Sequence, residues 1–422
     1  MYNIRDYGAV SDGITINYAS IQAAIDACAA NGGGRVVIPA GTFKSGTIWL
    51  KSNVELHLEM GAVLLGSDNI FDYNAEDAYP QNYGYAPEEW VGKHLIIAHE
   101  VENIAITGLG TIIGNGQSYF TGEIRHHGYY IWRDGVCTIR DKVNFRPGQM
   151  IAIIESKHIH IENITLRDST CWSCYLHGCE YVTIKGLKVY NDKAALNTDG
   201  IDLDCCRYVT VSDCIIETGD DAIAIRGVEK RVNNKLPCEY ITITNCVFGV
   251  SSSVFRISVG TGYIRHIRVS NISVYRGGVL VQFANSYNKN GSVKIEDVNF
   301  SNISATNIGC GLIMSANNGS YIKNITMENV RLEAAAMCNF ECEDGSTLDN
   351  IKLRNIELRM KDIYETPLKE EILDQRGQHC LRIHGMTNSI LDNVTVYNEF
   401  SDCPEPVSIT DCENLKIENC NF

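Results

Sequence analysis

Three aspartates whose spacing could support catalysis lie in the stretch NTDGIDLDCCRYVTVSDCIIETGDDAIAIR, which begins at Asn197. Asp199 precedes one strand-like run of alternating apolar residues, and the pair Asp220 and Asp221 precedes the next run. When the inward apolar residues of the two runs are aligned, Asp199 falls level with Asp221, 22 residues later. Side chains at the same level on neighbouring strands stack about 4.8 Å apart. We therefore expect two carboxylates close together, with Asp220 beside them and pointing in another direction.

This arrangement suits the hydrolysis of a glycosidic bond with inversion. In that reaction a protonated carboxyl donates to the glycosidic oxygen while a carboxylate about 6.5–9.5 Å away activates water on the opposite side. The stacked pair could hold the water, and the like charges would raise the pKa of one aspartate into a usable range. The alternative is a calcium site or a solvated acidic ridge, because hard cations favour clustered carboxylates. Asp202 and Asp204 alternate with apolar residues, so we expect them to face outward, toward substrate hydroxyls or solvent.

The elements that must position these aspartates form one long repeat. Alternating apolar residues, a central Asn, Asp or Gly, and further alternation recur in segments such as HIHIENITL, YVTVSDCII and YITITNCVF. Period-two alternation indicates strands with one buried face, and the central residue indicates a bend through the left-handed backbone region. Such repeats predict a parallel β-solenoid in which the Asn side chains stack on one another. The predicted bend residues are Asn163, Gly186, Asp213, Asn245, Asn271, Asn302, Asn329, Asn355 and Asn419, with Asn398 marking an irregular coil.

The N-terminal portion, about residues 1–50, is expected to cap the solenoid. Ile21, Ala24, Ile25 and Cys28 follow helical spacing, and a Gly run ends the pattern. A helix at this place would cover strand edges that otherwise invite association.

A second interruption of the repeat covers about residues 117–148. It includes RHHGYYIWR, from Arg125 to Arg133, which is aromatic with interleaved basic residues. We interpret it as a long loop over one face, which either walls a sugar subsite or covers the side of the solenoid. No Pro- or Ser-rich linker divides the chain, so residues 1–422 are predicted to form one all-β domain.

Composition argues against several classes of partner. The net charge of −15 argues against nucleic acid, because phosphate binding calls for basic patches. No run of 18 apolar residues exists, so we expect no membrane span, and the start MYNIRDYGAVSDG lacks a signal-peptide pattern. The 17 cysteines are scattered through apolar runs and suit a reducing compartment, which predicts a cytoplasmic protein. A signal trimmed from the chain would instead permit a secreted form.

These motifs resemble those of glycoside hydrolase family 28, the polygalacturonase-like enzymes. GGGRVVIPAGTFKSGTIWLKSNVELHLEMGAVLLGS resembles the family's N-terminal portion, and RPGQMIAIIESKHIHIENITLRDS resembles its approach to the active site. NTDGID and GDDAIAI resemble its two aspartate motifs. The resemblance implies a right-handed parallel β-helix of the pectin-lyase-like kind. It also implies that Asp220 is the general acid, that Asp199 and Asp221 position and deprotonate the water, and that Asn197 lines the site.

The sequence departs from the family at two motifs. Polygalacturonases carry a Gly-His-Gly motif in the next coil and an Arg-Ile-Lys motif in the coil after it, and these cations engage the substrate's carboxylate. Here the corresponding coils read SSSVFRISVGTG and YRGGVLVQFANS. Arg256 is expected to fill the space of the missing His, and Gln282 the space of the basic pair. The cleaved sugar is therefore expected to be neutral or differently charged, rather than that of plain polygalacturonan.

Three further residues are candidates for substrate binding. Arg226 ends the second strand-like run, where it could clamp a substrate oxygen or offset the aspartates' charge. Trp172 and His177 lie one coil before Asp199. Trp172 is either a sugar-stacking platform or a core aromatic, and His177 is either a ligand or a hydrogen-bonded coil residue.

We therefore expect an inverting, exo-acting glycoside hydrolase of pectic or related oligosaccharides that requires no metal or cofactor. One alternative is a polysaccharide lyase or epimerase that uses the aspartates as a calcium site, which a chelator would inhibit. Another is a non-catalytic carbohydrate-binding β-helix, which would have no reason to keep three aspartates in register. Fold alone does not choose among these functions. No oligomeric state is predicted.

Overall fold

The computed structural model describes two compact units built almost entirely of strands. The described residues are 1–74, 93–119, 132–133 and 136–137 (backbone), 146–193, 195, 197–229, 232–284, 292–361, 379–400, 403 and 405–422. The units are Met1–Gly219 with Lys230–Lys235, and Asp220–Glu229 with Leu236–Phe422. That residues 1–422 form one domain stays a prediction, which this division does not test. Among the described residues, no helix is long and apolar enough to cross a membrane.

In its described residues, the first unit contains one α-helix, three short helical turns and the strands β1 to β21. Its helical segments are η1 (Ile4–Tyr7), α1 (Tyr18–Ala30), η2 (Ile70–Asp72) and η4 (Gly116–Ser118). Its strands are β1 (Tyr2–Asn3), β2 (Asp12–Ile16), β3 (Gly34–Ile38), β4 (Gly41–Ser45), β5 (Ile48–Trp49), β6 (Val54–Leu58), β7 (Ala62–Gly66), β8 (Ile96–His99), β9 (Glu102–Gly108), β10 (Thr111–Ile113), β11 (Trp132–Arg133), β12 (Val136–Cys137), β13 (Ile151–Ile154), β14 (Lys157–Glu162), β15 (Thr165–Arg167), β16 (Cys174–His177), β17 (Glu180–Lys185), β18 (Lys188–Tyr190), β19 (Ile201–Asp204), β20 (Arg207–Ser212) and β21 (Ile215–Thr218).

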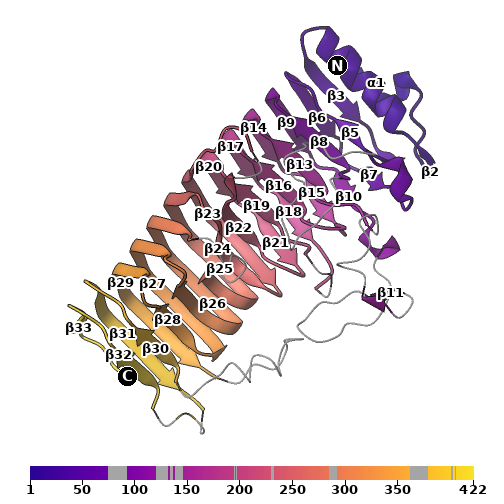
Figure 1. Cartoon of the computed structure of the whole chain (residues 1–422). Coiled ribbons are helices and arrows are strands. Elements are labelled where there is room, and N and C mark those ends of the chain that lie inside the picture. Colours follow the sequence, from indigo (N-terminus) through magenta and orange to yellow (C-terminus); the bar gives the residue numbers. More distant parts are fainter. Residues whose placement is uncertain are drawn as a thin grey trace. The chain divides into compact units, whose positions relative to one another are not determined.

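Three strands make one coil of the first unit, and equivalent strands of successive coils pair in parallel (Figure 1). Strand β14 pairs with β9 before it and β17 after it, so Ile161 lies level with Ile106 and Ile184. In the next coil, Val211 of β20 lies level with Ile184. These four side chains are buried, because alternation points every second residue inward. The predicted parallel β-helix is confirmed.

The second unit continues the same pattern with longer strands. Its strands are β22 (Ile223–Gly227), β23 (Cys238–Val250), β24 (Ser253–Gly260), β25 (Tyr263–Ala284), β26 (Lys294–Ala316), β27 (Tyr321–Ala336), β28 (Cys338–Cys342), β29 (Thr347–Met360), β30 (Leu381–His384), β31 (Ile390–Asn398), β32 (Val407–Thr410) and β33 (Lys416–Glu418). Strand β25 pairs in parallel with β23, β24 and β26. Its core contains edge-to-face aromatic pairs, with Phe255 5.5 Å and Phe283 6.2 Å from Phe300 between ring centroids.

The nine predicted bend residues all have positive φ, between 53° and 63°. In the second unit the Asn side chains form the expected ladder, with Asn302 donating to Asn271 at 3.2 Å. The irregular coil is placed differently from the prediction. Asn393, and not Asn398, has the positive φ of 55° and donates to Asn355 at 3.0 Å. The bend therefore precedes the last part of β31, whereas Asn398 ends that strand and donates to the carbonyl of Cys403 at 2.7 Å.

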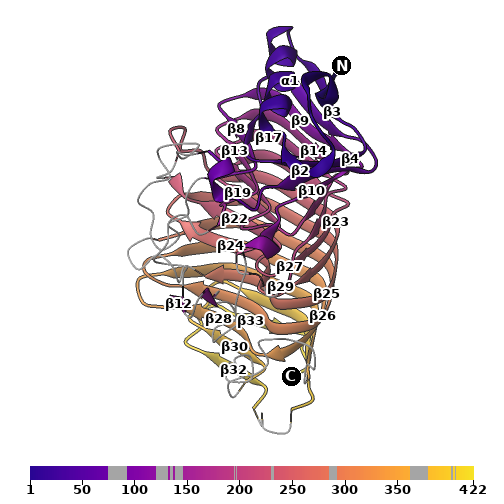
Figure 2. The same cartoon turned by 90° about the vertical axis from the view of Figure 1, so that its right-hand side faces the viewer.

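Helix α1 caps the N-terminal end of the first unit (Figures 1 and 2). Ile21, Ala24, Ile25 and Cys28 are completely buried, as their spacing predicts. They pack against β1, β3, β5 and β6. The turn after the helix requires glycine at Gly33, because a Cβ there would lie 2.3 Å from a backbone oxygen of the next coil.

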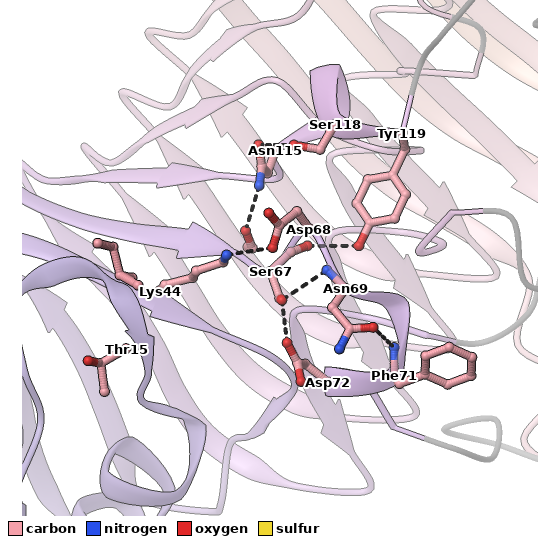
Figure 3. A network of polar contacts seen from close by, with 12 residues as sticks. Thr15, Lys44, Ser67, Asp68, Asn69, Phe71, Asp72, Asn115, Ser118 and Tyr119 are labelled. Atoms are coloured by element: carbon pink, nitrogen blue, oxygen red, sulfur yellow. Dashed lines mark hydrogen bonds and ion pairs between the residues drawn. The ribbon is translucent and has the colours of Figure 1, made fainter.

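A network of polar contacts joins the end of β7 to η4 (Figure 3). The hydroxyl of Tyr119 donates to the carbonyl of Ser67 at 2.8 Å, and the amide of Asn115 donates to the carbonyl of Gly66 at 3.1 Å. This network fixes the start of the predicted loop at residues 117–148. Most of that loop, including the side chains of RHHGYYIWR, lies outside the described residues.

Candidate active site

The backbone around Asp199 is held by the preceding coil of the first unit. The N–H of Ser173 donates to the carbonyl of Asp199 at 2.8 Å, and the N–H of Cys174 donates to that of Gly200 at 3.1 Å. Strand β19 then begins at Ile201, opposite Cys174 in β16. The side chain of Asp199 is only 5% exposed. A carboxyl at the start of this buried strand therefore occupies a defined position with little contact with bulk water.

A network of uncharged groups shapes the turn that leads into Asp199. The amide of Asn191 donates to the hydroxyl of Ser173 at 2.8 Å and to the carbonyl of Thr198 at 3.0 Å. Its oxygen accepts the N–H of Ser169 at 2.9 Å. Sequence reasoning missed Asn191, and only its place directly after strand β18 could have indicated it. Because Asn191 is buried and its side chain makes three hydrogen bonds, it stabilises the shape of this turn.

The predicted site residue Asn197 belongs to the same turn and adopts a left-handed backbone with φ of 53°. The guanidinium of Arg146 donates to its side-chain oxygen at 3.2 Å. Arg146 is 4% exposed and brings a positive charge to the segment that leads into Asp199. Sequence reasoning missed it, although it opens the RPGQM motif that resembles the family's approach to the active site.

In the second unit, Asp221 lies just before β22 and contacts two groups of the following coil. The N–H of Ser253 donates to its Oδ1 at 2.8 Å. The guanidinium of Arg256 donates two hydrogen bonds to the carboxylate. Its Nη2 donates to Oδ1 at 3.3 Å, and its Nε donates to Oδ2 at a shorter distance. Strand pairing brings Arg256 there, because β24 lies in register with β22 and Arg256 stands opposite Ala224.

These contacts fix the charge of Asp221. Burial acts to raise the pKa of Asp221, but the Arg256 guanidinium and the N–H of Ser253 outweigh it, so the pKa lies below its ordinary value. Asp221 is therefore ionised at neutral and mildly acidic pH, which suits a base and not a proton donor. Asp220 differs from Asp221, since it is half-buried and the Asp221 side chain is 3% exposed.

The two residues expected to replace the family's cationic motifs are neighbours. Arg256 in β24 stands opposite Gln282 in β25. The hydroxyl of Ser253 donates to the Oε1 of Gln282 at 2.8 Å, so Ser253 joins Gln282 to the group that binds Asp221. Sequence reasoning missed Ser253. Arg226, at the end of β22, is 4% exposed, and both of its expected roles stay predictions.

The interpretation of Trp172 as a sugar-stacking platform is wrong. Its side chain is 1% exposed and packs edge-on against Tyr175, with ring centroids 5.1 Å apart. A sugar platform needs an exposed ring face, which Trp172 does not offer. Its neighbours in this small core are apolar. They are Ile97, Ala152, Ile154, Cys171 and Tyr175.

The expectation that Asp202 and Asp204 are exposed to substrate hydroxyls or solvent is also wrong. Strand alternation places them, as predicted, on the face opposite to Leu203, but both are completely buried. The reason is that this face of the ladder is itself covered, since Tyr175 and His177 of the preceding strand are buried too. His177 is hydrogen-bonded to the Tyr175 hydroxyl at 2.8 Å. Of its two expected roles, the structure therefore supports the hydrogen-bonded coil residue. Neither His177 nor Asp202 has an exposed surface to offer a substrate.

The candidate residues are thus distributed over both units. Asp199 and Asn197 lie in the first unit, and Asp220, Asp221 and Arg256 lie in the second. The stacking of Asp199 on Asp221 stays a prediction from sequence register.

Comparisons with known proteins bear on the family. Residues 28–370 match the glycosyl hydrolases family 28. The chain is 26% identical over 332 residues to a probable polygalacturonase of Vitis vinifera, which covers 76% of this chain and 64% of the relative. It is 25% identical over 457 residues to the exo-poly-α-D-galacturonosidase of Dickeya chrysanthemi, which covers 100% of this chain and 70% of the relative. The chain thus spans less than two thirds of the length of the Vitis protein.

Solved structures share the fold. The family 28 exopolygalacturonase of Yersinia enterocolitica has a TM-score of 0.73 and 22% sequence identity, with 98% of this chain and 78% of that chain covered. The exopolygalacturonase of Thermotoga maritima has a TM-score of 0.65 and 18% identity, with 100% and 92% covered. The fold is the right-handed parallel β-helix. Because the family match extends over well more than half of its length, the chain belongs to glycosyl hydrolase family 28.

Proposed function

We propose that this protein is an inverting glycoside hydrolase in which Asp220 is the general acid and Asp199 and Asp221 activate the water. The observation that carries the proposal is the contact between Asp221 and Arg256, which keeps one carboxylate ionised beside a more exposed one. Inversion needs two carboxyl groups in different protonation states. Asp221 suits the base side of that pair. Asp220 is half-buried, so it suits a group that must reach a glycosidic oxygen.

The same contact opposes a calcium site at these aspartates. Both oxygens of Asp221 accept hydrogen bonds from the Arg256 guanidinium. A divalent cation there would compete for the oxygens and be repelled by the fixed positive charge. This argument favours the hydrolase over the lyase or epimerase, which would need calcium to neutralise a uronate.

We propose an exo-acting enzyme for short pectic or related oligosaccharides. The relatives named as an exo-poly-α-D-galacturonosidase and as exopolygalacturonases support the exo mode. Arg256 is engaged with Asp221, and the amide of Gln282 carries no charge, so neither residue offers a separate cation to a substrate carboxylate. We therefore propose that the cleaved sugar is neutral or differently charged, rather than that of plain polygalacturonan. Buried thiols such as Cys28, Cys174 and Cys179 support the cytoplasm as the place of action.

The proposal is tested by screening aryl-glycosides and pectic oligosaccharides with the wild-type protein, Asp220→Asn and Asp213→Asn. Asp213 is a matched control, because it is an exposed bend residue at a place where other coils carry Asn. We expect hydrolysis by the wild type and by Asp213→Asn that does not depend on added calcium, and loss of about 10²–10⁴-fold in Asp220→Asn. Unsaturated products that require calcium would favour the lyase, and equal activity of Asp220→Asn would contradict the assignment of the acid.

The substrate class has its own test in Gln282→Lys. This change restores a cation beside Arg256, so activity on galacturonate oligomers is expected to rise relative to activity on neutral glycosides. A wild type that already prefers galacturonate oligomers, with no gain in Gln282→Lys, would contradict the proposed sugar.

A further inference from the structure

Two buried cysteines lie in contact near the C-terminal end of the second unit. Cys380 directly precedes β30, and Cys403 lies between β31 and β32. Their sulfur atoms are 3.8 Å apart, and the two residues are 2% and 4% exposed. Both are present as thiols. The fold therefore brings together the two reactants of a disulfide bond, although they are 23 residues apart in the chain.

Other cysteines of the second unit direct their thiols to the backbone. Cys246, Cys412 and Cys420 each donate to the carbonyl two residues earlier, at 3.2–3.3 Å. The sulfur of Cys338 accepts the N–H of Leu312 at 3.4 Å. The recurring thiol contact of this fold is thus a local one, and a contact between two sulfurs of distant segments does not follow from the repeat.

Hydrogen bonds hold the backbone at both members of the pair. The N–H of Cys380 donates to the carbonyl of Pro406 at 2.8 Å, and its carbonyl accepts the N–H of Cys338 at 2.8 Å. The carbonyl of Cys403 accepts the side-chain amide of Asn398 at 2.7 Å. Because folding has already brought the two segments together, each thiol meets the other at a high effective concentration.

Little movement separates this arrangement from a disulfide. The bond is about 2.05 Å long, so the two sulfurs must approach by about 1.8 Å in total. In cysteine the sulfur is the only heavy atom beyond Cβ, so rotation about the Cα–Cβ bond moves it while the backbone stays in place. The approach therefore does not require the backbone hydrogen bonds of the pair to break.

We propose that Cys380 and Cys403 form a disulfide on exposure to a peroxide and that this bond stabilises the C-terminal coils of the second unit. Hydrogen peroxide oxidises one thiol to a sulfenic acid, with release of one water. The second thiol attacks that sulfur and displaces its hydroxyl group, which takes the thiol proton and leaves as a second water. Two electrons pass from the two sulfurs to the peroxide oxygens. In a reducing compartment the pair stays as thiols.

The position of the pair explains the stabilisation. The seven residues of β32 and β33 are all at least partly exposed. Strand β32 pairs with β30, so a disulfide beside these two strands fastens them to each other (Figure 1). The bond also closes a loop over 23 residues, which restricts the unfolded chain. Partly exposed elements open locally at low cost, and such openings give a small oxidant access to the pair.

The first test maps the disulfide in the full-length protein after treatment with hydrogen peroxide. The remaining thiols are alkylated, and the protein is digested with trypsin without reduction. Cleavage after Arg376 and Arg382 places the two cysteines in different peptides, so only a disulfide joins them. The peptide with Cys403 also contains Cys412, which makes Cys412→Ser the matched control. We expect the linked peptide in the wild type and in Cys412→Ser, and its loss in Cys403→Ser.

The second test compares the melting temperatures of the oxidised and the reduced protein. Oxidation should raise the melting temperature by about 5–10 °C in the wild type and in Cys412→Ser, and dithiothreitol should reverse the rise. Cys403→Ser should show no rise. Cys380→Ala serves where Cys403→Ser fails to fold, since it removes the other thiol without burying a hydroxyl.

A wild type that gives no linked peptide, under conditions that oxidise the partly exposed thiol of Cys412, would overturn the proposal. The pair would then be two packed thiols of the core. A link from Cys380 to Cys412 would overturn it as well, because the observed contact would not select the partner. A linked peptide without a rise in melting temperature would contradict the stabilising role of the bond.

Discussion

The two units hold their candidate aspartates in different ways. The contact described for Asp199 is to its backbone carbonyl, from the N–H of Ser173, while the uncharged network of Asn191 holds the neighbouring residue Thr198. Asp221 is held through its side chain, because the Arg256 guanidinium and the N–H of Ser253 both donate to its carboxylate. Both carboxyls are almost completely buried. The first unit therefore fixes the position of Asp199, and the second unit fixes both the position and the charge state of Asp221.

The largest expected effect is the loss of activity on neutralising either aspartate. Asp199→Asn and Asp221→Asn should each lower kcat/KM by about 10²–10⁴-fold, because both are proposed to activate the water. Steady-state kinetics on the best substrate of the screen measures this. The double variant should be little worse than either single one, because residues that act as a unit are not additive. Two independent, multiplying losses would contradict shared activation of one water.

The stability of the folded protein should depend on the ion pair between Arg256 and Asp221. Arg256→Gln leaves the buried carboxylate of Asp221 without its partner, so it should lower the free energy of unfolding by about 3–5 kcal/mol. Urea denaturation measures it. Arg331→Gln is the control, because Arg331 forms a longer, exposed pair with Glu357 at 3.4 Å and should cost at most about 1 kcal/mol. Equal effects of the two changes would show that Asp221 does not depend on Arg256.

The cost of Arg256→Gln should depend on pH. The pKa of Asp221 is lowered in the folded protein, so the stability gained from the pair is complete above the unfolded pKa of about 3.9 and is lost as pH falls through the folded value. The difference between wild type and Arg256→Gln should therefore be largest at neutral pH and shrink below about pH 4. The acid limb of kcat/KM should also move to higher pH in Arg256→Gln. A difference that grows on acidification would contradict this account.

A smaller effect is expected from Asn191→Ala, which breaks the network before Asp199 without removing a charge. Leaving Ser173, Thr198 and the N–H of Ser169 with fewer partners should cost about 1–3 kcal/mol of stability. Because the turn positions Asp199, kcat should fall more than KM changes. Asn329→Ala in the exposed Asn ladder is the comparison, with lower stability and unchanged kcat. An unchanged kcat in Asn191→Ala would remove this residue from the site.

Local patterns in the sequence predicted much of the fold. The nine bend residues and the buried face of α1 follow from period and residue type, because each depends on neighbours in the chain. Asn398 was misplaced because two Asn residues flank the last part of β31, and alternation does not distinguish them.

Contacts between coils were harder to predict. Alternation gave the correct face for Asp202 but not its burial, which depends on what covers that face. Arg256 was expected in the space of the family's missing His. Its pairing with Asp221, however, follows only from the register of β22 and β24. Arg146 lies 51 residues before Asn197, and no local pattern connects the two.

The anomeric configuration of the first-formed product tests the central claim most directly. Proton NMR is recorded during the hydrolysis of the best oligosaccharide by the wild type, before mutarotation equalises the anomers. Activation of water by Asp199 and Asp221, with Asp220 as acid, predicts a product of inverted configuration. A product of retained configuration would require an aspartate to act as nucleophile and would contradict the account.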